Sequence, residues 1–202
     1  MAEKLLLVPW FMGILYSSIP LFWFAIHPFA DRWRKMSKSP YRALLPLWVI
    51  IILALACATW PWRSVQIYSQ GWAWALALPF FALGLHTYAG IRSEFGRKVT
   101  GEAELRPNEH EQQLVVTGLH ARMRHPIYFA HLCNLAGWTM GSGLLVLFLL
   151  LTVSLILTFP LMIWLEEREL KKRFPQSYRD YKGAVPLISF PFSSHRYKKV
   201  SA

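Results

Sequence analysis

The chain has 202 residues, of which 54% are hydrophobic and only 16% are charged, and it carries a formal net charge of +11. A soluble domain of this size could not bury so much apolar surface, so the composition excludes an ordinary soluble protein. Lys and Arg residues cluster between long uncharged stretches, where loops flanking a membrane would lie, which argues against nucleic-acid binding. We therefore expect a lipid bilayer, and no nucleic acid, among the partners.

Three uncharged stretches in the first half of the chain each predict one transmembrane helix. The first covers residues 5–30, which is too long for the apolar core of a cleaved signal peptide, so we expect it to be retained. A basic loop at residues 31–42 follows. The second and third stretches cover residues 43–62 and 72–91.

The second half of the chain predicts a helical hairpin between two polar segments. Residues 92–125 form a loop with six basic and five acidic residues, and residues 166–202 form a charged tail. Residues 126–165 between them contain no Asp, Glu, Lys or Arg, which is about twice the length that one crossing requires. Gly141-Ser142-Gly143 interrupts this stretch and predicts the turn. The expected fold is a single all-α integral membrane domain, residues 1–202, with five transmembrane helices.

The distribution of the Lys and Arg residues predicts an orientation. Residues 31–42, 92–125 and 166–202 contain five, six and nine of them, whereas the remaining segments contain only Lys4 and Arg63. Five crossings place the three rich segments on one side, and the positive-inside rule makes that side cytoplasmic. We expect the N-terminus outside, the C-terminus and the active site inside, and a prokaryotic inner membrane, because the chain is short.

Several kinds of site are not predicted. Cys57 and Cys133 lie within apolar stretches without a CxxC partner, so we expect two buried free thiols. No expected helix carries His residues four apart with an acidic partner, so no metal site is predicted. The GxGxxG fingerprint is absent, so an adenosyl cofactor would have to bind without a Rossmann domain.

Two charged clusters flank the predicted hairpin. Arg124-His125-Pro126 starts the fourth helix, whose first backbone N–H groups would favour a carboxylate or phosphate, and Glu166-Glu167 ends the fifth. A hairpin brings its open ends together, so the clusters are expected to form one basic–acidic pocket. The tail carries an apolar stripe that could cover this pocket: Leu170, Phe174, Tyr178 and Tyr181. Alternatively, each cluster is a solvated helix end.

Four side chains share one half of the fourth helix at a period of 3.6 residues: Arg124, Tyr128, His131 and Trp138. This stripe could line a groove for an acceptor, or it could pack against the fifth helix through hydrogen bonds. His27 and His86, each alone in an uncharged stretch, are expected to be structural.

Two motifs in the last half of the chain resemble the isoprenylcysteine carboxyl methyltransferase family, with which phospholipid methyltransferases share the pattern. The first is Gln112-Gln113-Leu114-Val115, Gly118 and Arg124-His125-Pro126-Ile127-Tyr128, which resembles LV…G…RHPxY. The second is Glu166-Glu167, Leu170, Phe174, Tyr178, Tyr181 and Val185-Pro186, which resembles EExxLxxxF…Y…Y…VP. The resemblance covers about residues 112–186.

The resemblance implies a methyltransferase that uses S-adenosylmethionine, bound between the last two helices and the tail. By position, the cofactor contacts would be Gln112, Gln113, Leu114, Val115, His120, His125, Pro126, Ile127, Tyr128 and Glu166. The candidate acceptor-binding residues are Arg124, His131 and Met162. An apolar or lipidated acceptor would enter from the bilayer, and the implied reaction is O-methylation of the carboxylate of an isoprenylcysteine-like acceptor. A carboxylate needs no general base, so no catalytic residue is assigned.

The acceptor stays open, because members that methylate prenylated cysteine place a substrate-facing arginine where this chain has Met162. One alternative is N-methylation of phospholipid headgroups. A second is a sterol reductase-like membrane redox protein, and a third is a non-catalytic membrane adaptor.

Overall fold

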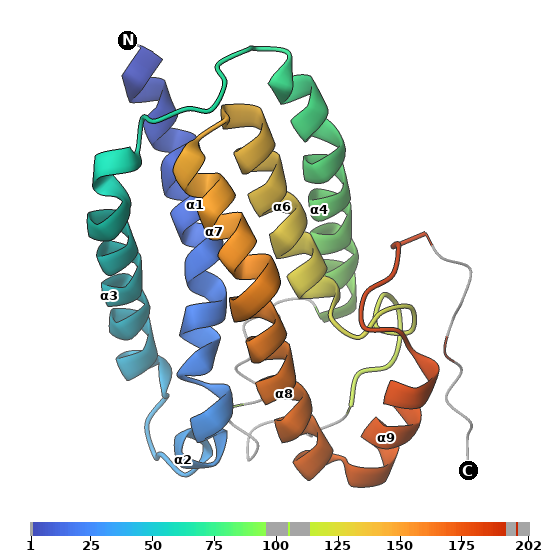
Figure 1. The fold of residues 1–202 in the computed structure, drawn as a ribbon. Helices are drawn as coiled ribbons and strands as arrows, with labels where there is room; N and C mark the ends of the chain where they lie inside the picture. The colour runs from blue at the N-terminus through green and yellow to red at the C-terminus, as the bar shows by residue number, and fades with distance from the viewer. Residues whose placement is uncertain (1, 96–104, 106–113, 193–196, 198–202) are drawn as a thin grey trace.

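The computed structural model describes residues 2–95, 105, 114–192 and 197, and these residues form a bundle of helices (Figure 1). The first half of the chain contains α1 (Ala2–Phe24), the 3₁₀ helix η1 (His27–Phe29), α2 (Ala30–Arg34), α3 (Tyr41–Thr59), the 3₁₀ helix η2 (Trp60–Trp62) and α4 (Ala73–Phe95). The second half contains α6 (Pro126–Ser142), α7 (Leu145–Val153), the π-helical segment η4 (Ser154–Thr158), α8 (Phe159–Arg173) and α9 (Pro175–Ala184).

Four segments of the described chain are long and apolar enough to cross a membrane: Lys4–Arg34, Tyr41–Trp62, Ala73–Arg92 and Leu145–Arg173. The bundle also exposes large apolar side chains on its outer surface, for example Ile50 at 61% and Ile156 at 74%, as a lipid-facing surface would. The chain is therefore an integral membrane protein. The remaining predicted crossing, α6, has 17 residues, which is the lower limit of about 17 for a span, so the number five stays a prediction.

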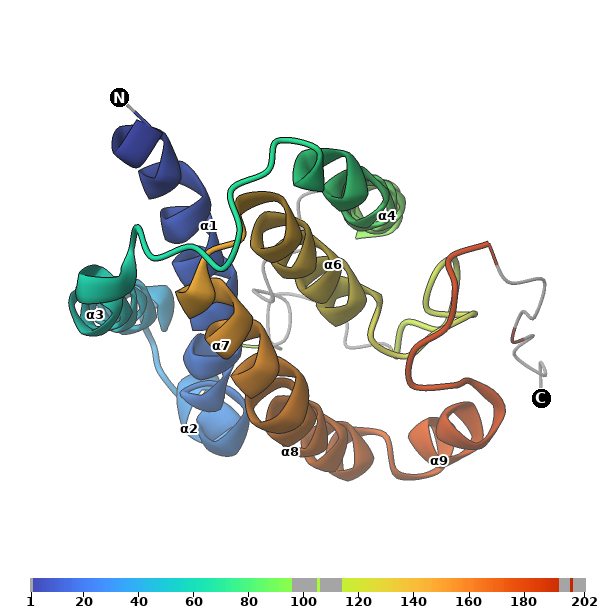
Figure 2. The ribbon, with the colours of Figure 1, turned by 45° about the horizontal axis from the view of Figure 1, so that its top comes forward.

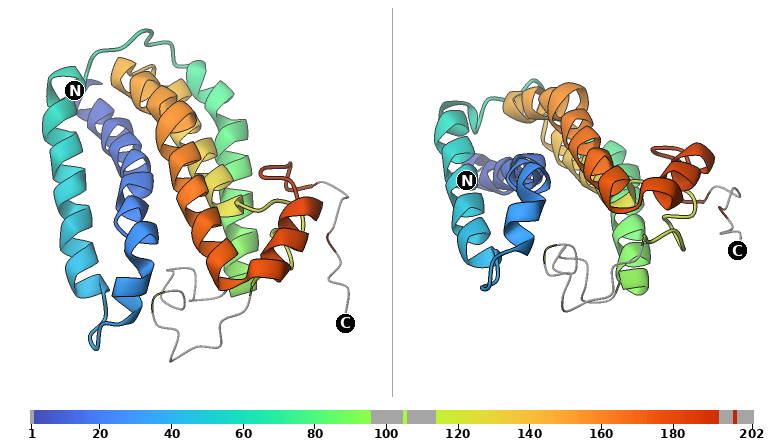
Figure 3. Two further views of the ribbon diagram at one scale, coloured as in Figure 1. Left: turned by 60° about the horizontal axis from the view of Figure 1, so that its bottom comes forward. Right: turned by 90° about the horizontal axis from the view of Figure 1, so that it is seen from below.

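The bundle has two distinct ends. Helix α2, the last turns of α4 and helix α9 lie at one end, whereas residues 60–72 and the N-terminus lie at the other (Figures 1 and 3). The segments rich in Lys and Arg thus leave the helices at the same end, as alternating crossings require. Which side of the membrane this end faces stays a prediction.

Helices α1 and α3 pack together through two tryptophans that donate hydrogen bonds between them. Trp10 Nε1 donates to Thr59 Oγ1 at 3.1 Å, and Trp48 Nε1 donates to Ser18 Oγ at 2.9 Å. An indole N–H in an apolar environment needs such a partner, so these two bonds fix how the helices face each other.

Helices α4 and α6 approach each other closely because glycines line their interface (Figure 2). A Cβ atom on Gly84 would lie 2.1 Å from Asn134 Nδ2, and one on Gly137 would lie 2.8 Å from Phe81 Cε1. Small residues allow this kind of contact between membrane helices. His131 belongs to the same side of α6, where it pairs with the Tyr88 hydroxyl of α4 and lies 6.0 Å from the Tyr16 ring of α1.

The polar stripe of the fourth helix packs against more than one neighbouring helix. Tyr128 does contact Phe159 of α8, and Trp138 packs near Leu147 of α7. Trp138 also contacts Phe81 of α4 at 5.1 Å between ring centroids, and His131 faces α1 and α4. Trp138 and His131 can reach α4 because glycines line the interface between α4 and α6 and let the two helices approach closely.

The turn of the predicted hairpin is present at Gly143, which ends α6 with φ +65°. Its N–H donates to Thr139 O at 3.0 Å, and its carbonyl accepts from the Ile67 N–H at 2.8 Å. The Leu145 N–H donates to Val65 O at 2.9 Å. The segment after η2 is therefore hydrogen-bonded across the tip of the hairpin.

Replacing Gly143 with alanine is expected to destabilise the protein by roughly 2 kcal/mol or more. The left-handed backbone alone costs about 1–2 kcal/mol for a residue with a Cβ atom. That Cβ atom would also lie 2.2 Å from the Tyr68 carbonyl oxygen. The measurement is unfolding in detergent micelles. Gly71→Ala is the matched control, because a Cβ atom there meets nothing within 4 Å. Equal stability of both variants would contradict the prediction.

The two cysteines differ in environment. Cys133 on α6 is buried, as expected, whereas Cys57 on α3 is exposed, so the expectation of two buried thiols is wrong for Cys57. Helix α3 lies at the edge of the bundle and packs on α1, which leaves its opposite side uncovered (Figure 2).

Candidate active site

The two charged clusters at the ends of the hairpin meet, as predicted. Arg124 Nε lies 2.9 Å from Glu167 Oε1. His125 lies between the two carboxylates, with Nδ1 3.3 Å from Glu166 Oε2 and Nε2 3.4 Å from Glu167 Oε1. All four side chains are at least four-fifths buried, so their charges interact more strongly than they would in water.

The start of α6 positions His125. Pro126 occupies the first helical position, and the His125 carbonyl accepts the Phe129 N–H at 3.1 Å. The His125 ring stacks on Tyr128, with ring centroids 5.3 Å apart and an interplanar angle of 7°. Tyr128 in turn packs with Phe159 and the fully buried Met162. Tyr128 thus separates the charged cluster from the apolar interior of the bundle.

The tail folds back beside the cluster. Helix α8 ends at Arg173 and α9 begins at Pro175, so the proline marks the change of direction. Three buried residues of the tail, Tyr178, Tyr181 and Val185, form a small core against which the partly buried Leu114, Val116, Leu170 and Phe174 pack. The Tyr181 hydroxyl donates to His120 O at 2.7 Å. The predicted apolar stripe therefore packs against residues 114–120, next to the start of α6 (Figure 3).

The segment after α9 binds the backbone just before α6. The Arg124 N–H donates to Pro186 O at 3.0 Å, and the His125 N–H donates to Leu187 O at 3.3 Å. Arg124 Nη1 also donates to Val185 O at 2.5 Å. The tail thus occupies the two backbone donors just before the helix, whereas the prediction for the donors of the first helical turn stays a prediction.

Glu167 is the centre of the charge network. It contacts Arg124, His125 and the ammonium of Lys182 on α9, so it joins three elements of the chain. Burial by itself lowers the pKa of His125, but the charges of Glu166 and Glu167 outweigh it and raise this pKa above its ordinary value of 6.5. The protonated His125 therefore stabilises the fold below that ordinary value, and this contribution is lost as pH rises through the raised pKa.

Two buried polar atoms at this site make no hydrogen bond within the described residues: Glu166 Oε2 and the Tyr178 hydroxyl. The contact between Glu166 Oε2 and His125 is an ion pair whose geometry does not make a hydrogen bond. Burial, and then the charge of Glu167, raise the pKa of Tyr178, so its hydroxyl stays protonated. Unsatisfied buried polar atoms are costly and indicate a place for a ligand or water.

Most of the predicted cofactor residues gather around this place. These residues belong to the segment packed on α9, to the start of α6 and to the middle of α8: Leu114, Val115, His120, His125, Pro126, Ile127, Tyr128 and Glu166. Gln112 and Gln113 lie outside the described residues. Of the predicted acceptor residues, Met162 lies against Tyr128, Arg124 points to Glu167 and the tail, and His131 lies deeper between α1 and α4. Their roles in binding stay predictions.

The sequence did not indicate Lys182 as part of the site. Lys182 stands 15 residues after Glu167, on a different helix, so no helical spacing links them. Tyr178 belongs to the predicted apolar stripe and to the second motif, but nothing in the sequence indicates that its hydroxyl is buried at the site.

A model of the phospholipid methyltransferase family matches residues 72–177, which is more than half of the chain. The chain belongs to the phospholipid methyltransferase family. The match contains α4, the helical hairpin and both charged clusters. Comparison with curated proteins and with solved structures gave no significant match.

Membership of the phospholipid methyltransferase family makes the chain a membrane methyltransferase that acts on lipid-like substrates. Members of this family typically use S-adenosylmethionine. The predicted class of reaction is thus confirmed, whereas the isoprenylcysteine acceptor and the prokaryotic source stay predictions.

Proposed function

We propose that this protein transfers a methyl group from S-adenosylmethionine to a lipid acceptor at the cluster formed by Arg124, His125, Glu166 and Glu167. The observation that supports this most is the buried Glu166 Oε2, which makes no hydrogen bond within the described residues and lies where the start of α6 meets α8. The match to the phospholipid methyltransferase family includes this part of the chain, which supports the proposal.

The residues present fit the proposed cofactor. Its ammonium and ribose hydroxyl groups are donors that suit Glu166 Oε2, and its carboxylate and ring nitrogens are acceptors that suit the Tyr178 hydroxyl. Leu114, Val115 and Ile127 are apolar residues of this part of the chain, and their side chains could contact the apolar parts of the cofactor. When bound, S-adenosylmethionine supplies a methyl group on a positively charged sulfur.

The chain itself contributes orientation and the exclusion of water. Tyr128, Phe159, Met162 and Ile163 form a buried apolar cluster beside His125, on the side that faces the bundle. An apolar acceptor that lies against this cluster would present its polar end to the charged site. Holding two reactants in line is a large part of what such an enzyme can supply.

We place a phospholipid amine first among the acceptors and the carboxylate of an isoprenylcysteine-like molecule second. Met162 is fully buried among apolar side chains and offers no charge to a carboxylate. Arg124 is held by Glu167 and by carbonyls of the tail. The RHPxY resemblance keeps the carboxylate as the second candidate.

The test is methyl transfer from radiolabelled S-adenosylmethionine to extracted membrane lipids by the purified protein. Label that resists mild base would support an N-methylated lipid, whereas label released by mild base would support a methyl ester. Absence of label from every apolar fraction would contradict both. Binding of a reduced nicotinamide in place of S-adenosylhomocysteine would support the redox alternative.

A further inference from the structure

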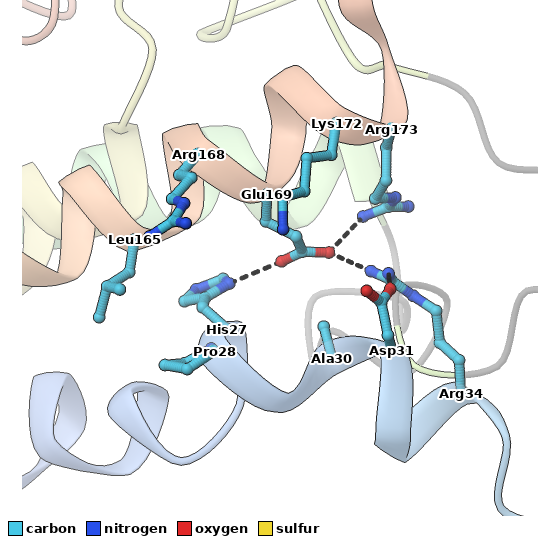
Figure 4. A pocket seen from close by; sticks show the side chains of 10 residues that line it. All are labelled: His27, Pro28, Ala30, Asp31, Arg34, Leu165, Arg168, Glu169, Lys172 and Arg173. Atoms are coloured by element: carbon cyan, nitrogen blue, oxygen red, sulfur yellow. Dashed lines mark hydrogen bonds and ion pairs between the residues drawn. The ribbon is translucent and has the colours of Figure 1, made fainter.

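A second polar cavity of about 190 Å³ lies between α8 and the segment formed by η1 and α2 (Figure 4). Seven polar residues that line it are His27, Asp31, Arg34, Arg168, Glu169, Lys172 and Arg173. The lining includes neither Glu166 nor Glu167 nor any residue of α9, so this cavity is separate from the candidate active site.

One wall of the cavity is an ion-pair network centred on Glu169. His27 Nδ1 lies 2.9 Å from Glu169 Oε2, Arg173 Nη1 lies 3.3 Å from Oε1, and Arg34 also contacts this carboxylate (Figure 4). The side chains of His27 and Glu169 are 2% and 10% exposed. This network fixes α2 against α8, and its cations balance the negative charge of Glu169.

The α8 side of the lining also carries positive charge that the Glu169 network does not balance. Arg168 and Lys172 both line the cavity, and neither has an acidic partner among the residues that the structure describes. The described residues of the lining include one other acid, Asp31, which pairs with Arg34 at 3.2 Å and is largely exposed. The lining contains four Lys or Arg residues and two acids, so the cavity suits an anion.

The surface next to this positive charge is apolar. Leu161 and Trp164, on the same helix, are 42% and 55% exposed and precede Arg168 by seven and four residues, or two turns and one turn. The Arg168 guanidinium lies 5.6 Å from the Trp164 ring. Along α8, an exposed apolar surface thus passes directly into a cationic cavity, as a molecule with an anionic head and apolar chains would require.

We propose that this cavity binds the phosphate of an anionic glycerophospholipid, whose acyl chains lie along Leu161 and Trp164. Basic pockets between membrane helices at a bilayer surface bind anionic headgroups in this way. The Glu169 network already holds α2 and α8 together, and the bound lipid would add a further contact between these two helices. This site does not depend on which molecule is methylated.

The experiment measures binding of phosphatidylglycerol and phosphatidylcholine to the purified full-length protein in detergent, by native mass spectrometry and without a methyl donor. The wild type should bind phosphatidylglycerol at least tenfold more tightly. The double variant Arg168→Gln/Lys172→Gln should bind it roughly 30-fold more weakly, because each cation near a bilayer contributes about a factor of 5. Lys172→Gln alone, at an exposed position, should bind it about fivefold more weakly.

The matched control is Lys171→Gln/Arg179→Gln, which removes two exposed cations outside the cavity and should change the affinity less than twofold. An equal loss of affinity for phosphatidylglycerol in this control would overturn the proposal, because binding would then depend on the net charge of the protein and not on the cavity. Equal affinity for phosphatidylcholine would overturn it as well. So would full displacement of the lipid by millimolar inorganic phosphate, which would indicate a site for free phosphate.

Discussion

Replacing Glu167 with glutamine is expected to lower the free energy of unfolding by about 3 kcal/mol. Glutamine keeps the shape of the side chain but removes the charge that Arg124, His125 and Lys182 share. The Arg124 side chain is only 10% exposed, so it cannot turn to water when its partner is lost. Breaking a buried pair by removing one member typically costs about 3–5 kcal/mol.

The measurement is chemical unfolding in detergent micelles, with two comparisons. Lys182→Gln should cost under about 1 kcal/mol, because its side chain is 37% exposed and partly screened by solvent. Asp180→Asn, at an exposed position of α9, should cost no more than about 0.5 kcal/mol. If Glu167→Gln cost no more than Asp180→Asn, Glu167 would not be the centre of the charge network.

Replacing Glu166 with glutamine is expected to weaken the binding of S-adenosylhomocysteine by roughly 10- to 100-fold. A hydrogen bond to a charged group contributes about 1.5–3 kcal/mol, and the buried Oε2 atom is the acceptor that we assign to the ligand. An amide at this position has half the acceptor capacity and no charge. The rate of methyl transfer at limiting donor should fall by at least the same factor.

Isothermal titration calorimetry on the folded fraction checks this result. Glu169→Gln is the matched control, because Glu169 is a largely buried acid one turn later on α8 that belongs to the His27 and Arg34 network. That variant should lose stability and yet keep the affinity for S-adenosylhomocysteine within about twofold. Equal losses of affinity in both variants would show that the effect comes from the end of α8 in general and not from a contact of Glu166.

Much of the topology could be predicted because a membrane restricts the possible structures. Long uncharged stretches must become helices, since backbone groups have no other partners in lipid. The glycines near residue 142 interrupt a stretch too long for one helix, and a hairpin must bring its open ends together. That constraint was sufficient to predict that His125 would lie near Glu166.

The remaining features depend on contacts between segments far apart in the chain, which leave no periodic signal. The pairing of α4 with α6 follows from Gly84 and Gly137, which could equally have served as flexible positions in either helix. The exposure of Cys57 depends on α3 being at the edge of the bundle. The hydrogen bonds from the Arg124 and His125 N–H groups to the Pro186 and Leu187 carbonyls could not be predicted, because backbone groups are the same in almost every residue type.

The hydrogen bonds between residues 65–67 and the hairpin tip have a mechanical consequence. They anchor α6 and α7 at the end farthest from His125, so any change in the angle between the two arms pivots about Gly143. Helix α6, with 17 residues, is about 25 Å long, and a rotation of about 5° at the pivot moves its other end by roughly 2 Å. Small rotations at the tip are thus amplified at the carboxylates, and the exchange of ligands there needs no large rearrangement of the helices.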